Sequence, residues 1–141
     1  DISFVLKHYT HDFKEDISRL ISLGIGTSGN IVDLADSIIG YAVAEGASDI
    51  HLEPGRAESI ISFRIYGVLH KVLTLPRDIH LAVVARFKLM PNLKIDDYRH
   101  PQDGRIELER IANTSLRVST MPTLYGEKIV LRILDDSHTD L

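Results

Sequence analysis

Apolar residues recur with the helical period between residues 31 and 45. They form one stripe, while Asp33, Asp36 and Glu45 fall outside it. Gly46 follows directly and suits the position after a helix end, where a left-handed backbone is common. The pattern predicts a helix over residues 31–45 that buries one side. The stripe consists of Ile31, Leu34, Ala35, Ile38, Ile39, Ala42 and Val43.

A second helix is predicted over residues 78–90, where Asp78 supplies an N-cap and the proline at position 91 stops the helix. A weaker helical spacing lies within residues 1–24. The sequence GIGTSGN, residues 24–30, is polar and glycine-rich and reads as a linker, with Ser28 or Asn30 as a cap for the helix that follows.

Six stretches have strand character, because β-branched and aromatic residues gather between turn residues. The first three strands come from residues 48–54 and from the run 59–76, which Tyr66-Gly67 divides into a hairpin. The last three begin at residues 105, 115 and 127, with turns at Asn113-Thr114 and Tyr125-Gly126. The order of one helix, three strands, one helix and three strands predicts an α+β fold. We expect a mainly antiparallel sheet of two three-stranded segments, with the helices packed on it, in a single domain.

Composition is that of a water-soluble globular domain: 141 residues, 44% hydrophobic and 26% charged. No apolar run reaches the roughly 18 residues of a membrane-spanning helix, and the first residues lack the features of a signal peptide. The absence of a starting Met predicts an excised or processed piece. The chain has no cysteine, which excludes disulfides and thiol catalysis.

Charge is unevenly distributed along the chain. Residues 1–60 carry 10 acids and 4 bases, whereas residues 61–141 carry 10 acids and 12 bases. This difference is either ordinary surface variation or a sign that the second half faces an anion.

The sequence HPQDGR, residues 100–105, predicts a tight turn in which Asp103 and Gly104 tolerate positive φ. Arg99 and Arg105 flank it, Arg64 lies beside the Tyr66-Gly67 turn, and Arg117 lies in a strand. Each arginine has a plain interpretation: Arg105, for example, shares a strand face with Glu107 and Glu109 and could pair with them. The alternative is that several arginines converge on a phosphate, which the planar guanidinium binds through two nitrogens.

Other motifs are weaker. Gly24, Gly26 and Gly29 satisfy G-x-G-x-x-G, but the elements around them do not form a parallel crossover, and the phosphate-loop pattern is absent. Asp49, His51 and Glu53 alternate on one strand face and could bind a metal. We favour local hydrogen bonds or a partner surface for these three residues, because no other histidine is an obvious fourth ligand. No metal site is therefore predicted, and a metal hydrolase is the least favoured reading. No nucleophile elbow for a catalytic triad is present.

Taken together, five blocks resemble the bacterial ATPases of type II secretion and type IV pilus assembly, of the GspE/PilB type. In order these blocks are GASDIHLEP, FRIYGVL, RFKLM, RHPQDGRI and LRVSTMPTLYGEKIVLRIL. The resemblance covers about residues 30–134, and it is to the N-terminal, PAS-like domain that precedes the RecA-like ATPase domain in those proteins.

The resemblance implies residue roles and partners. Arg64, Arg105 and Arg117, with Arg99 as a fourth, would contact the phosphates of ATP bound with Mg²⁺ on the RecA-like domain of the same or a neighbouring subunit. The full protein would be a homo-hexamer at the cytoplasmic face of the inner membrane. It would act with inner-membrane secretion proteins, would not insert into the membrane and would not bind nucleic acid.

The chain alone is expected to have no catalytic residue, no bound cofactor and no ATPase activity. Its expected organisation is a linker or helical segment at residues 1–29, the domain at 30–136, and the start of a linker to the ATPase domain at 137–141. Asp49, His51, Glu53, Asp103 and Gly104 are expected to shape turns and the domain interface. The alternative left open is a stand-alone PAS-like module that binds a ligand or partner without catalysis.

Overall fold

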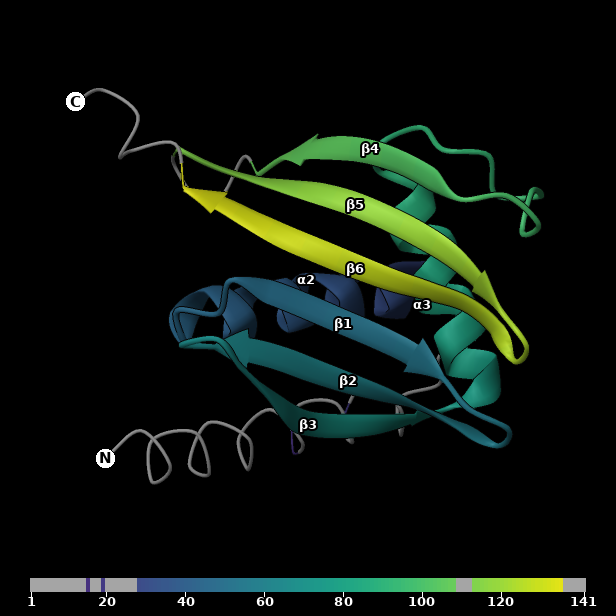
Figure 1. Cartoon of the computed structure of the whole chain (residues 1–141), viewed down its shortest axis with the longest axis horizontal. Coiled ribbons are helices and arrows are strands. Elements are labelled where there is room, and N and C mark those ends of the chain that lie inside the picture. The colour runs from purple at the N-terminus through teal and green to yellow at the C-terminus, as the bar shows by residue number, and fades with distance from the viewer. Residues whose placement is uncertain (1–14, 16–18, 20–27, 109–112, 136–141) are drawn as a thin grey trace.

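The computed structural model describes residues 15, 19, 28–108 and 113–135. Two helices and six strands follow in chain order (Figure 1). Their bounds are α2 Ser28–Ala44, β1 Asp49–Pro54, β2 Glu58–Ile65, β3 Val68–Pro76, α3 Arg77–Leu89, β4 Gln102–Glu107, β5 Thr114–Thr123 and β6 Gly126–Asp135. The helix predicted within residues 1–24 lies outside the described residues except for Glu15 and Arg19, which are both helical.

The six strands form one open sheet in the order β3-β2-β1-β6-β5-β4, and every neighbouring pair is antiparallel. The predicted α+β class and the two three-stranded segments are therefore confirmed. What joins the segments is the pairing of the first strand with the last, in which Ile50 lies opposite Leu131. The segment containing α3 then leads from β3 at one edge of the sheet to β4 at the other (Figure 1).

Both helices lie on the same side of the sheet (Figure 1). The strand residues that face them are fully buried, as Ile50 and Leu52 in β1 and Leu131 in β6 illustrate. Because side chains alternate along a strand, the residues between them point to the opposite side, which neither α2 nor α3 covers and which we call the helix-free face. Neither α2 nor α3, nor any other helical segment among the described residues, has the length and apolarity to cross a membrane.

The backbone geometry agrees with the sequence prediction at one hairpin turn and at one helix end. Tyr66 and Gly67 have φ angles of 51° and 78°, as a two-residue hairpin turn with the twist of its strands requires. Gly46 has φ 72° and donates to the carbonyl of Val43, while Ala47 donates to that of Ala42. These two bonds form the helix end that the glycine predicted. The start of α2 differs from the prediction, because Ser28 and Gly29 are already helical.

The predicted turn at HPQDGR is wrong. Asp103 and Gly104 lie inside β4, opposite Ser119 and Val118, and Gly104 is not among the glycines with positive φ. The glycine is required for a different reason. A Cβ atom there would lie 2.7 Å from the Cβ of Pro91, so the segment after α3 packs directly on the β4 backbone.

We predict that Gly104→Ala lowers the free energy of unfolding by about 1–3 kcal/mol, because the added methyl group must displace a packed proline. Gly40→Ala is the matched control, since a Cβ at this exposed helical position meets nothing within 4 Å. It should raise stability by roughly 0.5–1 kcal/mol through helix propensity. Urea unfolding of the 141-residue chain measures both variants, and equal effects at the two positions would contradict the packing account.

Candidate functional site

The helix-free face carries a line of charged residues that crosses five strands. Arg64 in β2 lies opposite Asp49 in β1, and Asp49 lies opposite Arg132 in β6. Arg132 in turn lies opposite Arg117 in β5, which lies opposite Arg105 in β4. We call these five residues the arginine row. Four strand spacings separate its ends, a distance of about 19 Å.

Asp49 sits between two of the arginines. Its Oδ1 accepts a hydrogen bond from Nε of Arg132 at 3.0 Å, and its Oδ2 lies 3.6 Å from Nε of Arg64. The Ser48 hydroxyl donates to the same Oδ2 at 3.0 Å. The Asp49 side chain is only 6% exposed although it stands on the helix-free face, whereas those of Arg64 and Arg132 are 37% and 64% exposed. The carboxylate is thus covered, while the two guanidinium groups still face solvent.

The other two arginines of the row differ in their contacts. Nε of Arg105 lies 3.3 Å from Oε1 of Glu107 in an exposed pair, which is the strand-neighbour pairing that the sequence left open as one alternative for this residue. Arg117 is exposed, and within the described part of the chain its side chain forms no hydrogen bond or ion pair. With Asp49 and Glu107 counted against the four arginines, the row keeps an excess of positive charge.

The remaining candidates lie off the row. Arg99 belongs to the segment before β4, where its backbone N–H donates to Asp97, so it is not one of the cross-strand neighbours that form the row. His51 and Glu53 continue along β1 from Asp49 on the same face. Burial, reinforced by the positive charge of Lys128, lowers the pKa of His51. Among the described residues no three His, Asp, Glu or Cys side chains gather as metal ligands.

Arg132 was missed by the sequence analysis. The alternation around it gives a signal: Ile129 and Leu131 are buried, so Lys128 and Arg132 must point the other way. The sequence pattern alone does not give the strand register that places Arg132 between Asp49 and Arg117.

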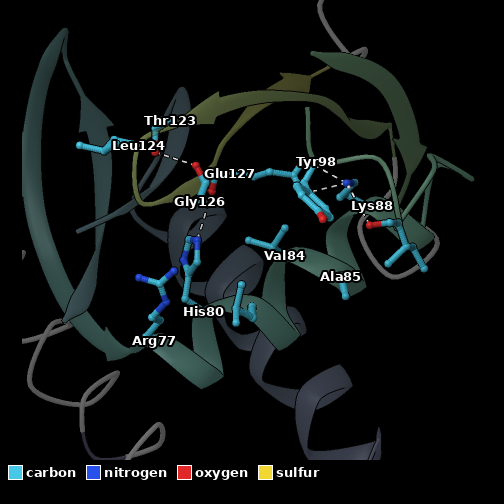
Figure 2. A pocket seen from close by; sticks show the side chains of 12 residues that line it. Arg77, His80, Val84, Ala85, Lys88, Tyr98, Thr123, Leu124, Gly126 and Glu127 are labelled. Carbon is cyan, nitrogen blue, oxygen red and sulfur yellow. Dashed lines mark hydrogen bonds and ion pairs between the residues drawn. The ribbon is translucent and has the colours of Figure 1, made fainter. Parts of the chain in front are cut away.

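A second region of charged residues lies between α3 and the β5–β6 turn, at a pocket of about 450 Å³ (Figure 2). Lys88 contacts both carboxylate oxygens of Glu127 at 2.9 Å. Its ammonium group also donates to the carbonyls of Asp97 at 3.0 Å and Ile95 at 3.4 Å. The Lys88 and Glu127 side chains are 1% and 8% exposed. The N–H donors of the Lys88 ammonium group are all engaged in these contacts. This pair therefore ties helix, loop and hairpin together and leaves no free charge for a ligand.

His80 supports the same junction from α3. A carbonyl oxygen only accepts, so Nε2 of His80 must be the donor in its 3.1 Å contact with the backbone oxygen of Glu127. In the neutral ring Nδ1 then carries a lone pair, and it is buried without a partner within the described structure. Burial lowers the pKa of His80, although the bond to Glu127 opposes this and the charge of Arg77 adds to it.

The geometry defines an α+β domain with one helix-covered face and an opposite face that carries the arginine row. Residues 26–141 match the family described as "Type II/IV secretion system protein", and the chain belongs to this family.

Curated relatives agree with this assignment. The chain is 45% identical over 108 residues to the type IV pilus assembly ATPase TfpB of Acinetobacter baylyi, a match that covers 75% of this chain and 18% of that protein. It is also 45% identical over 113 residues to the type II secretion system ATPase E of Vibrio cholerae, covering 79% and 22%. The match to the type IV pilus assembly ATPase PilB of Myxococcus xanthus is 41% over 113 residues, covering 79% and 20%. The chain spans about a fifth of the length of these relatives.

One solved structure resembles the fold only distantly. The ATPase DotB of Legionella pneumophila aligns with a TM-score of 0.48 and 18% identity, over 69% of this chain and 28% of that one. A likeness of this size adds nothing to the family assignment.

We predict that Lys88→Met lowers the free energy of unfolding by about 3–5 kcal/mol, because it leaves the Glu127 carboxylate buried without its counter-ion. The double variant Lys88→Met/Glu127→Leu should recover part of the loss, since no charge then remains buried. Glu107→Gln is the control: its pair with Arg105 is exposed and should change stability by at most about 1 kcal/mol. Urea unfolding compares them, and a Lys88 effect as small as the control would contradict a structural role for the buried pair.

The depressed pKa of His80 predicts that stability falls in mild acid. Below the ordinary value of 6.5 the unfolded chain takes up a proton that the folded ring resists, so unfolding becomes more favourable as pH drops. His80→Gln places an amide donor near the Glu127 carbonyl and cannot titrate. Between pH 7.5 and pH 5.5 its free energy of unfolding, measured with urea, should fall less than that of the unmodified chain. An equal fall in both would show that His80 does not cause the loss of stability in acid.

Proposed function

We propose that this chain is the domain of a secretion or pilus ATPase that presents arginines to the phosphates of ATP held by another domain. The observation that carries the proposal is the arginine row. Arg64, Arg105 and Arg117 come from three separate sequence blocks, and they lie on one sheet face together with Arg132.

The row is suited to an anion with several phosphates. A guanidinium group binds phosphate through two parallel N–H donors, and residues in paired strands are held in fixed relative positions. Arg117 in particular is exposed and makes no bond to the described residues, so it could bind a ligand without losing a contact to them. A triphosphate is shorter than the row, so each bound nucleotide would contact some of the four arginines at a time.

The wider role is proposed from the relatives. Their names describe ATPases of type II secretion and type IV pilus assembly. By analogy this domain would be the N-terminal neighbour of a RecA-like domain that binds ATP and Mg²⁺, within a homo-hexamer at the cytoplasmic side of the inner membrane. It would move against the RecA-like domain as phosphate binds and leaves, and the chain alone would not hydrolyse ATP.

Such arginines act by neutralising the charge that develops on the transferred phosphoryl group. A single arginine finger contributes about 10³ to 10⁵ in rate in the best-studied cases. Since four arginines share the row here, removal of one should have a smaller effect.

We predict that Arg117→Ala in the full-length protein lowers kcat for ATP hydrolysis by about 10- to 100-fold, because one positioned charge is lost from the transition state. Arg56→Ala is the matched control, since this exposed arginine lies between β1 and β2 and away from the row, and it should leave turnover unchanged.

The measurement is steady-state ATP turnover at equal hexamer content. Unchanged turnover in Arg117→Ala, and also in Arg105→Ala, would refute the proposed function. It would favour instead a module that binds a ligand or partner and takes no part in catalysis.

A further inference from the structure

Resting on this proposed function, we infer that Asp49 is a positioning residue of the phosphate site, which fixes the guanidinium groups of Arg64 and Arg132 for a polyphosphate. The charge of Asp49 would by itself argue against a role in binding phosphate. A carboxylate close to bound phosphate repels it, so by charge alone the row would bind an anion better without Asp49.

The geometry of the contacts gives the first argument. Asp49 meets both arginines at Nε: Oδ1 takes the hydrogen bond of Arg132, and Oδ2 lies near Arg64. The Nε atom is on the inner side of the guanidinium group, so the contacts with Asp49 do not use the terminal nitrogens. Nη1 of Arg64 donates to the carbonyl of Gly67 at 3.0 Å, which adds a second restraint to this side chain. Both guanidinium groups are therefore held at Nε, and that of Arg64 is also held at one terminal nitrogen.

Burial gives the second argument. The side chain of Asp49 is 6% exposed, and the Ser48 hydroxyl bonded to Oδ2 limits its rotation. A covered carboxylate holds a fixed direction, unlike that of Glu107, which is 73% exposed in its pair with Arg105. A mobile arginine loses several rotameric freedoms when it binds phosphate, and a carboxylate that already restrains it reduces this loss.

Because these two effects oppose each other, kcat and KM should respond differently to the loss of the Asp49 charge. Removal of the negative charge should strengthen the general attraction for ATP, which governs binding in the ground state. Loss of the restraint should weaken stabilisation of the transition state, which requires the guanidinium groups in place. A positioning role thus predicts a lower kcat without a higher KM.

The test is Asp49→Asn in the full-length protein, a change that keeps the size of the side chain and removes its charge. We expect kcat for ATP hydrolysis to fall about tenfold, with KM for MgATP unchanged or lower. Glu58→Gln is the control: it removes a charge from an exposed position at the opposite end of β2 from Arg64, and none of the described residues forms an ion pair with it. It should leave kcat unchanged.

A double-mutant cycle separates positioning from folding. Arg132→Lys removes the Nε donor, so Asp49→Asn should lower kcat less in that background than in the unmodified protein. An effect of the same size in both backgrounds, or a raised KM with kcat unchanged, would overturn the inference. If Arg117→Ala lowers turnover while Asp49→Asn does not, the inference fails and the proposed function stands.

A second measurement applies to the 141-residue chain itself. The Nε–H proton of Arg132 should exchange slowly with water by NMR in the unmodified chain and rapidly in Asp49→Asn. Rapid exchange in both would show that Asp49 does not restrain the arginine, whatever the full-length variant does.

Discussion

The pairing of β1 with β6 is the contact on which both the sheet and the arginine row depend. Each half of the chain forms a three-stranded segment by local hairpins, and this long-range pairing makes them one sheet. It places Ile50 beside Leu131 on the core face and Asp49 beside Arg132 on the helix-free face. A shift by two residues would keep apolar positions inward but would place Arg132 opposite His51, so the register itself builds the site.

Sequence reasoning succeeded where structure is decided locally. The Tyr66-Gly67 hairpin follows from backbone preferences, and the stripe of α2 follows from a periodic pattern in neighbouring positions. The Asp-Gly pair at positions 103 and 104 was read by the same local rule, and the reading failed. Gly104 is explained by its contact with Pro91, which is distant in sequence, so only the folded chain reveals the reason for the glycine.

The members of the arginine row were easier to predict from the sequence than their arrangement. Motif blocks indicated Arg64, Arg105 and Arg117, and the sheet brings these three into one line. Arg99 was grouped with them because it is close to Arg105 in sequence, yet it precedes β4 and lies off the row. The position of Arg132 and the role of Asp49 depend on strand register, which hydrophobic alternation does not specify between distant segments.

The buried pair of Lys88 and Glu127 and the arginine row differ in how their charges are balanced. Lys88 and Glu127 are both buried and satisfy each other, so their pair closes a junction. In the row, by contrast, Arg132, Arg117 and Arg105 are direct cross-strand neighbours with like charge. Such neighbours destabilise a sheet, and the one carboxylate in the row, Asp49, compensates only part of this. An arrangement that weakens the folded sheet is poorly explained by folding alone. Its cost is understandable if an anion supplied from outside the domain completes the charge balance, as the proposed function requires.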